Sequence, residues 1–524
     1  MAAPNVVIDP ITRIEGHLRV ECEVENGVIK DAWVSGSLFR GMEMVLKGRA
    51  PADAFYIAQR ICGVCPISHG HASTMSAEQA LGITIPNGAR IVRNIIEAAQ
   101  YLHSHILWFY TLAALDYIDP GKALEANIAN TYALAEQAGT TTSDFKAVQD
   151  KLKGLVAGGQ LSIFTNGWFN HPAYSQTMPP ELALIGVAHY LEALELQAEA
   201  ARVIAIMGGK FPHFMTSLPG GTAWVPTEEK LDDILFRLMR VRDFVYNTMI
   251  PDTLAIAPFY TEALSYGGGH GNFLSWGVFN RESLEMKDRY LPDGAVFKSG
   301  GLKADASDPA KIKEYVKRSW FAAGDGNLNP AEGQTNPDFT KYDVNAQYTW
   351  AKAPRYDGKP MEAGPLSRML VAYLKGVEPV KKIVDVALAK LGATGKPEVL
   401  VSLLGRIAAR NLETAVVADW SIEWVNELTA ALKGGDVKLF EPTTASAGDG
   451  AGMWEAPRGA LGHWMTVSSG RIEHYQICTP STWNIGGRDD QGVTGVIEEA
   501  LIGAPCIDTE KPMEAARIVR SFDP

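Results

Sequence analysis

The sequence predicts an α+β fold that is mostly helical, with a core of long helices and small β-sheets or hairpins formed by the N- and C-terminal parts of the chain. Apolar residues recur at helical spacing over long segments in the middle of the chain. Segments with strand-like alternation and glycine turns lie near both ends. Hydrophobic residues make up 46% of the 524 residues and low-complexity tracts are absent, which excludes disorder as the dominant state.

The first predicted part, residues 1–50, is a β-hairpin region. His17–Val24 alternates in part between apolar and polar residues, and Val28–Val34 resumes the pattern. The Asn-Gly pair at positions 26–27 is a strong signal for a hairpin turn. We therefore expect two antiparallel strands here.

The second part, residues 51–285, is predicted to be a helical core that also carries a Cys-x-x-Cys site. Asn87–Ile118 places apolar residues on one helical face over about 30 residues. A second helix is expected between the Pro-Pro and Gly-Gly pairs that bound residues 179–209, because proline favours helix starts and glycine helix ends. A third spans Pro226–Phe259, with a kink at Pro251.

The remaining chain divides into three further parts, and we expect all five to pack as one large domain. Residues 286–364 are rich in Gly, Pro, Asp and Asn and predict an irregular, loop-rich insertion with a few strands. Residues 365–435 are predicted to be helical and residues 436–524 to hold a C-terminal hairpin and an active-site segment.

The individual segments are helices at Gly364–Leu391 and Lys396–Leu432, a hairpin of His463–Val467 with Arg471–Ile477, and short helices at Glu498–Ile502 and Pro512–Ser521. The hairpins from the two ends are candidates for one shared sheet.

The charge balance argues against a nucleic-acid partner. The chain has 48 Lys and Arg against 60 Asp and Glu, a net charge of −12, and no basic run. Binding a phosphate backbone needs a basic surface, which this composition does not provide.

The five cysteines are too sparse for a disulfide framework, so we expect thiols or metal ligands. The N-terminus lacks a charged region followed by an apolar stretch, so no signal peptide is expected. No apolar run reaches the roughly 18 residues of a membrane helix, so any membrane association should come through a partner.

The sharpest local feature is the segment from Arg60 to His71, which contains Cys62 and Cys65. A Cys-x-x-Cys pair suits one metal ion or one disulfide, and the nearby arginine favours thiolate. A structural zinc site would need a second ligand pair, and a thioredoxin-like motif would follow a strand, whereas the upstream sequence here looks helical. We favour a functional site over two packed cysteines.

Three other segments are weak by themselves. Asp9–His17 gathers Asp, Arg, Glu and His, and its simplest interpretation is a solvated turn with an ion pair. Glu455–Gly459 contains one arginine, which in isolation suggests a surface charge. Pro480–Asn484 follows the predicted C-terminal hairpin and by itself indicates a turn.

Together these segments resemble the large subunit of nickel-iron hydrogenases of the uptake type. Six motifs occur in the order of that family: RIEGH at 13–17, FRGME at 39–43, RICGVCPISH at 60–69, EAPRG at 455–459, PSTWN at 480–484 and SFDP at 521–524. The similarity covers essentially the whole chain. It implies reversible heterolytic cleavage of H2 into protons and electrons, in the direction of H2 oxidation.

The resemblance also implies a ligand set. In this family thiolates bridge nickel and iron, and the iron carries CO and CN. Cys62 is expected to be terminal on nickel and Cys65 to bridge both metals. Thiolates are soft ligands and suit nickel and iron. The side chain of Glu43 and the backbone carbonyl of Ile477 are expected at a Mg²⁺ site.

The remaining matched residues surround this centre. Arg458 is expected to lie over the metals and, with Ser481, to donate hydrogen bonds to the cyanides. Pro457 is expected to form one wall. Three carboxylates complete the set, namely Asp116 and Asp523 around the arginine, and Glu15 as the acid that relays the proton from a thiolate.

The sequence departs from the family pattern after Asp523 and Pro524. The family continues with Cys-x-x-Cys-x-x-His, so only two of four thiolates are present here. Three explanations stay open: a non-standard residue such as an oxidised cysteine or selenocysteine, a disordered tail in a cofactor-free or immature form, or a truncated, inactive chain. We favour the first two, because the other active-site motifs are retained.

The expected partner follows from electron flow. No cysteines remain for iron–sulfur clusters in this chain, so a small subunit that carries the clusters is implied. Export in the folded state on the partner's signal predicts a periplasmic location, with membrane attachment through partner subunits such as a cytochrome or another electron acceptor. Two alternatives are an H2-sensing regulatory subunit and a metal-free scaffold like the quinone-binding relative in respiratory complex I. The scaffold predicts loss of both cysteines, which are retained.

Overall fold

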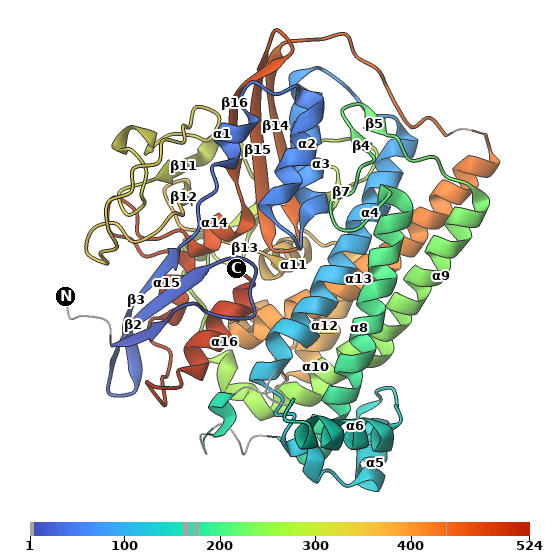
Figure 1. Cartoon of the computed structure of the whole chain (residues 1–524), viewed down its shortest axis with the longest axis vertical. Coiled ribbons are helices and arrows are strands. Elements are labelled where there is room, and N and C mark those ends of the chain that lie inside the picture. The colour runs from blue at the N-terminus through green and yellow to red at the C-terminus, as the bar shows by residue number, and fades with distance from the viewer. Residues whose placement is uncertain (1–4, 161–166, 171–172, 174–177, 436) are drawn as a thin grey trace.

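Four long helices form the centre of the fold in a computed structural model that describes residues 5–160, 167–170, 173, 178–435 and 437–524. Helix α4 (Asn87–Ile106) packs against α8 (Pro180–Gly208) and α13 (Leu403–Lys433), and α9 (Glu228–Phe244) packs against the same two. The four run side by side through one half of the molecule (Figure 1). The predicted core of long helices is therefore a four-helix bundle, to which α13 contributes from outside residues 51–285.

Local signals account for the ends of these helices. Helix α8 begins with proline in its first turn and ends at Gly209, which has a φ of 78° that glycine adopts without strain. The side chains of Thr227 and Ser402 cap α9 and α13 by accepting backbone N–H groups. The helix predicted to Ile118 continues beyond α4 as a π-helical segment at Leu107–Ala113 and a 3-10 turn at Ala114–Asp116.

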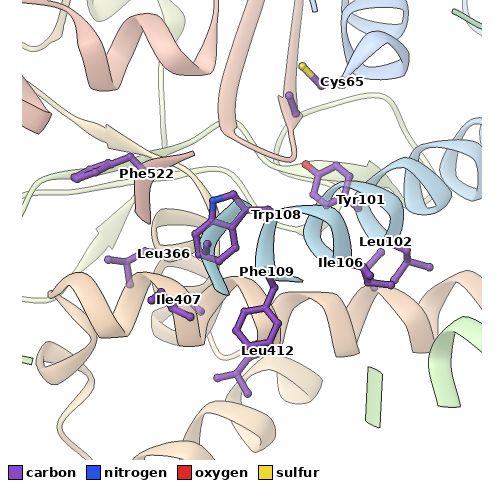
Figure 2. Packing of buried hydrophobic residues seen from close by; sticks show 14 of the residues in the cluster. Cys65, Tyr101, Leu102, Ile106, Trp108, Phe109, Leu366, Ile407, Leu412 and Phe522 are labelled. Carbon is purple, nitrogen blue, oxygen red and sulfur yellow. The ribbon is translucent and has the colours of Figure 1, made fainter. Parts of the chain in front are cut away.

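The bundle buries a continuous apolar core. Leu102, Ile106 and Phe109 belong to it from the first helix, and Leu412 belongs to it from α13. Figure 2 shows Phe109 pointing toward Leu412, across the interface of the two helices. Burial of such side chains stabilises the fold by about 1.5–3 kcal/mol each.

The C-terminal sheet lies on the other side of the molecule. It is antiparallel, with strands β14 (Gly448–Ala456), β15 (Gly459–Ser468) and β16 (Arg471–Cys478). Helix α3 (Pro66–Ala80) packs directly on β14. Gly450 and Gly452 allow this approach, because a Cβ at either position would collide with backbone carbonyls of the helix. The predicted hairpin is confirmed, and β14 extends it to three strands.

The N-terminal hairpin is also confirmed, but the idea of one shared sheet is wrong. Strands β1 (Val6–Ile8), β2 (Leu18–Glu25) and β3 (Val28–Gly36) form a separate antiparallel sheet. The free edge of β3 is occupied by residues 503–506: Ile29 donates to the carbonyl of Ala504, and Gly503 donates to that of Ile29. This edge is therefore not available to the C-terminal strands.

The helix expected over Gly364–Leu391 is two helices, α11 (Pro365–Leu374) and α12 (Glu378–Lys390). Gly376 has a φ of 73°, which ends the first helix, and Pro379 lies in the first turn of the second. In the third predicted segment, a π-helical stretch at Val245–Met249 joins α9 to α10 (Ile250–Ile256), which has Pro251 in its first turn.

Smaller elements connect these parts. The helices are α1 (Met42–Leu46), α2 (Ala54–Ala58), α5 (Ile128–Ala138), α6 (Phe145–Ala157), α14 (Pro480–Ile485), α15 (Val496–Leu501) and α16 (Met513–Phe522). The strands are β4 (Ser217–Leu218), β5 (Gly221–Thr222), β6 (Phe273–Ser275), β7 (Val278–Asn280), β8 (Arg289–Leu291), β9 (Gly294–Val296), β10 (Ala304–Asp305), β11 (Ile312–Tyr315), β12 (Ala353–Tyr356) and β13 (Glu362–Ala363). Among the described residues, no helix combines the length and apolar character needed to cross a membrane.

Candidate metal centre

The Cys62–Cys65 pair lies in the turn that leads into α3. A short 3-10 helix at Gln59–Ile61 precedes it, and Cys65 is the residue before the first turn of α3. The backbone N–H of Cys65 donates to Sγ of Cys62 across 3.0 Å. Both side chains are buried, with 7% and 4% of their surface exposed. The helical context that argued against a thioredoxin-like motif is thus present.

Contact between the two thiols shifts their pKa values in opposite directions. A side-chain hydrogen bond from the thiol of Cys65 lowers the pKa of Cys62, against burial, and Arg458 adds attraction for the thiolate. The same hydrogen bond, together with burial, raises the pKa of Cys65. The shift at Cys62 is toward the thiolate, which is the form that binds soft metals.

Arg458 occupies the tip of the β14–β15 hairpin. Ala456 pairs with Gly459, so Pro457 and Arg458 form a two-residue turn. Nη2 of Arg458 lies 3.0 Å from Oδ1 of Asp523, and both side chains are buried. Burial opposes the guanidinium charge, but attraction to Asp523 and to the two cysteines outweighs it and raises the pKa of Arg458. The arginine is therefore charged and lies close to the thiols.

Asp116, the second carboxylate expected around Arg458, is buried and forms ion pairs with Arg520 and Arg13. The carboxylate of Asp116 accepts from Nη1 of Arg520 at 2.8 Å and from Nη2 of Arg13. Burial opposes its ionisation, but the two arginines outweigh this effect and lower the pKa of Asp116. Arg520 belongs to α16, the helix that leads to Asp523, so Asp116 anchors the segment that carries the Arg458 partner.

Glu15 lies at the surface next to the cysteine turn. Its Oε1 accepts from the backbone N–H of Gly63 across 3.1 Å, and its side chain is exposed in this chain. It also exerts an electrostatic effect on both thiols. Glu15, the acid predicted to relay protons, is therefore exposed to solvent and in contact with the turn that carries the buried thiols.

Glu43 and Ile477 line one cavity of about 190 Å³, together with Lys352 and Glu314. Burial raises the pKa of Glu43, and the charge of Lys352 opposes the shift. The two residues expected at a Mg²⁺ site, 434 positions apart in the sequence, thus meet at one place.

Ser481 lies in the first turn of α14, which Thr479 caps by accepting the N–H of Thr482. Its side chain is half-buried. Helix α14 packs against β15, the strand that begins just after Pro457 and Arg458, and against β13. The two motifs assigned to cyanide binding therefore lie on adjoining elements.

One buried network was not identified from the sequence. Arg368 donates to both oxygens of Glu413 and to Glu455, all with no exposed surface, and Glu413 also binds His105. The available signal was charged residues within otherwise apolar helical segments, which is too common to single out a site.

A buried thiol pair next to a buried arginine–aspartate pair is the candidate metal centre of this large α+β protein. Within the described part of the chain, no group of three or more His, Cys, Asp or Glu side chains is arranged to hold a metal ion.

Comparison with known proteins identifies the family. A family model described as nickel-dependent hydrogenase matches residues 40–524, and one described as HoxL-like matches residues 5–35. The large chain of hydrogenase-2 from Escherichia coli (strain K12) is 40% identical, covering 99% of this chain and 96% of the relative. The uptake hydrogenase large subunit of Rhodobacter capsulatus is 38% identical, covering 100% of this chain and 94% of the relative.

Solved structures agree. The Ni-Fe-Se hydrogenase of D. vulgaris Hildenborough in the reduced state superposes with a TM-score of 0.82 at 36% identity, covering 99% of this chain and 98% of that one. The reduced, active Ni-Fe-Se hydrogenase of Desulfomicrobium baculatum gives a TM-score of 0.82 at 33% identity, with 99% and 98% covered. The chain belongs to the nickel-dependent hydrogenase family.

Proposed function

We propose that this chain is the catalytic subunit of a nickel-iron hydrogenase that oxidises H2. The observation that carries the proposal is the placement of the buried Cys62–Cys65 pair within electrostatic reach of the Arg458–Asp523 pair. Membership of the nickel-dependent hydrogenase family supports the activity, and the relatives named uptake hydrogenase support the direction of H2 oxidation.

The residues present at the site fit a nickel-iron group. Nε of Arg458 and Oδ2 of Asp523 are buried without a partner, as expected of side chains that await one. Cys62 and Cys65 would hold the metals, while Arg458 and Ser481 would donate to the cyanides of the iron. Two further thiolates belong to this family's centre. Pro524 is buried and directly follows Asp523, so any residues after it would begin beside the Arg458–Asp523 pair.

When bound, the metal group supplies the Lewis acid that polarises H2. The chain itself must then move a proton. Cys62 is the thiolate base of the pair, and Glu15 lies between the cysteine turn and solvent. A carboxylate near a thiol can accept its proton and release it to water, which is general acid–base catalysis. Glu15 is therefore proposed as the exit for protons.

Arg458 supplies a positive charge that acts on both thiols. Its Nη2 is held by Asp523 and its Nη1 lies 3.4 Å from Oγ of Ser104, so the guanidinium is oriented before any ligand arrives. Pro457 precedes it in the hairpin turn, has fixed backbone torsion and forms part of the wall. Asp116 acts on the site indirectly, because its ion pair with Arg520 holds α16, the helix that leads to Asp523.

A Mg²⁺ ion is proposed for the cavity that Glu43 and Ile477 share. Magnesium prefers oxygen ligands, and a carboxylate with a backbone carbonyl supplies two of them. The nearby Lys352 and Glu314, whose Nζ and Oε2 lie 3.3 Å apart, would orient the remaining ligands or waters.

Electrons must leave through another subunit. Cys22, Cys478 and Cys506 are buried free thiols. We propose a small subunit with iron–sulfur clusters that docks near the cysteine turn, where the apolar side chains of Leu38, Met44 and Val45 are about half exposed. A periplasmic location, with membrane attachment through partner subunits, is proposed from the uptake hydrogenase relatives.

The test is the intact mass of the purified subunit together with its nickel and iron content. One nickel and one iron per chain, with a mass above 56.8 kDa, would support the full ligand set. Extra mass without nickel would indicate an immature form. Absence of nickel from a chain of 56.8 kDa purified with its partner would contradict the catalytic role.

A further inference from the structure

The segment Glu362–Arg368, which joins β13 to α11, contacts all three C-terminal parts of the proposed centre. We call it the clamp segment. It lies where the irregular insertion meets the helical part, and no motif marks it. Its side chains are buried throughout. Residues that sit between several functional segments can fix the distances among them.

The first contact joins Arg368 to the hairpin tip that carries Arg458. Nη1 of Arg368 donates to the carbonyl of Ala456 at 2.8 Å, and Nη2 donates to that of Pro457 at 2.8 Å. These are the two carbonyls directly before Arg458, so the guanidinium of Arg368 is bonded to the backbone of the hairpin turn itself. Loss of these donors would leave buried acceptors unpaired, which costs about 1–3 kcal/mol each.

The other donors of Arg368 fix its own position. Nε and Nη2 donate to the two oxygens of Glu413 at 2.6 and 2.7 Å, and Nη1 donates to Glu455 at 2.8 Å. The ring of Tyr101 covers the guanidinium, with 5.1 Å from its carbon to the ring centre. All of these groups are buried. The guanidinium fork is thus held rigidly, and a lysine cannot reproduce it.

The second contact joins the clamp segment to the motif that carries Ser481. Asn484 in α14 donates to the carbonyl of Ala363 at 2.8 Å and accepts its N–H at 3.1 Å. At Gly459, just after the hairpin tip, a Cβ would lie 2.5 Å from the backbone nitrogen of Gly364. The two motifs therefore rest on adjacent residues of one short segment.

The third contact reaches the end of α16. Nε and Nη2 of Arg406 donate to the two oxygens of Glu362 at 2.7 and 2.8 Å. The same guanidinium covers the ring of Phe522, 3.7 Å from its centre, and Phe522 precedes Asp523. The clamp segment thereby joins Arg458, Ser481 and Asp523 through three separate elements.

We propose that the clamp segment Glu362–Arg368 is the positioning element that sets the spacing between Arg458 and Ser481. Its positioning residue is Arg368, and Asn484 of α14, which hydrogen-bonds to Ala363, is the second. Neither residue needs to touch substrate. Their effect on the reaction would be exerted through the two donors that face the metal group. This inference rests on the proposed function for its chemical consequence, but its structural content does not depend on any metal.

The first experiment is hydrogen exchange on the full, metal-free chain. Arg368→Lys should speed exchange at residues 455–461 about tenfold or more, because buried hydrogen bonds are lost. The matched control is Arg93→Lys, since Arg93 also forks onto a buried glutamate, Glu78, and donates to two backbone carbonyls. The control should leave residues 455–461 unchanged. Wild-type exchange there in Arg368→Lys, or equal acceleration in both variants, would overturn the proposal.

The second experiment uses infrared spectroscopy of the metal-loaded complex with its partner. Arg368→Lys should shift the cyanide stretching bands relative to wild type, whereas Arg93→Lys should not. Bands that stay unshifted in Arg368→Lys would overturn the positioning role. Absence of such bands from the wild-type complex would instead contradict the proposed function, so the two failures differ. If Arg368→Lys does not fold, Asn484→Ala serves, with faster exchange expected at residues 480–486.

Discussion

Arg458 and Asp523 form a buried ion pair, with 3.0 Å between Nη2 of the arginine and Oδ1 of the aspartate. The two residues are 65 positions apart and come from a hairpin tip and the end of α16. Each has another polar atom, Nε and Oδ2 respectively, that is buried without a partner. The pair is therefore preorganised for an additional group, and this arrangement leads to the first prediction.

Removing the charge of Arg458 should destabilise the chain more than removing both charges. Arg458→Met leaves Asp523 buried without its cation, which costs about 3–5 kcal/mol of unfolding free energy. The double variant Arg458→Met/Asp523→Asn should recover much of that loss. Arg458→Lys should fold nearly as well as wild type but lower kcat by roughly 10²–10³, because the fork donors are lost. Chemical denaturation and turnover measure these effects, and equal stability of wild type and Arg458→Met would refute the assignment.

Each cysteine of the pair should be required for nickel. Cys62→Ser and Cys65→Ser replace a soft thiolate by a hydroxyl, so nickel per chain should fall to background while the melting temperature changes little. Cys478→Ser is the matched control, because Cys478 is also buried and free but lies in β16. Metal analysis of purified chains checks this. Nickel retained in both pair variants, or lost equally in the control, would mean that the centre lies elsewhere.

Glu15→Gln should slow proton transfer without changing the metal content. Glutamine keeps an oxygen that can accept from Gly63, so the cysteine turn should stay intact. Loss of the ionisable group should lower H2 turnover roughly 10²–10⁴-fold. Glu25→Gln, in the exposed N-terminal turn, is the control. If turnover in Glu15→Gln matches wild type at equal nickel content, protons leave by another route.

As pH is lowered, the free energy of unfolding should begin to decrease at a higher pH than protonation of carboxylates alone would cause. Burial lowers the pKa of His103 from 6.5 to about 4, and the charge of Arg458 acts in the same direction. The stability from neutral His103 is therefore complete above about pH 6.5 and is lost as pH falls toward 4. Between these limits one such group contributes a slope of about 1.4 kcal/mol per pH unit.

His103→Gln should remove this contribution. Compared at pH 7 and pH 5, the unfolding free energy of the variant should decrease less than that of wild type. His17→Gln, at an exposed position, should follow the wild type. Parallel pH dependence in wild type and His103→Gln would show that His103 is not held neutral by the fold.

The sequence predicts those features that depend on local chemistry. Proline and glycine bound α8, and Asn-Gly marks the turn between β2 and β3, so these elements appear where expected. The break between α11 and α12 was not predicted, although Gly376 provides a local signal for it. Sheet assignment failed because residues 503–506 cover the edge of β3, a pairing over more than 470 positions that no local pattern encodes.

The candidate site divides in the same way. The Cys62–Cys65 turn is a continuous motif, and resemblance to the family located Arg458, Asp523 and Glu15. The partner of Asp116 depends on how α16 approaches the end of the first helix, and such packing is not visible in sequence. Arg368 was missed for a related reason, since its acceptors belong to strands and helices far along the chain.

The most direct test of heterolytic H2 cleavage at this centre is isotope exchange. The purified complex of this chain with its partner is held in D2O under H2, and the gas phase is followed by mass spectrometry. Heterolytic cleavage exchanges one atom at a time, so HD should appear before D2, and Cys65→Ser should abolish both. A complex that contains nickel and iron but forms no more HD than Cys65→Ser would contradict the account.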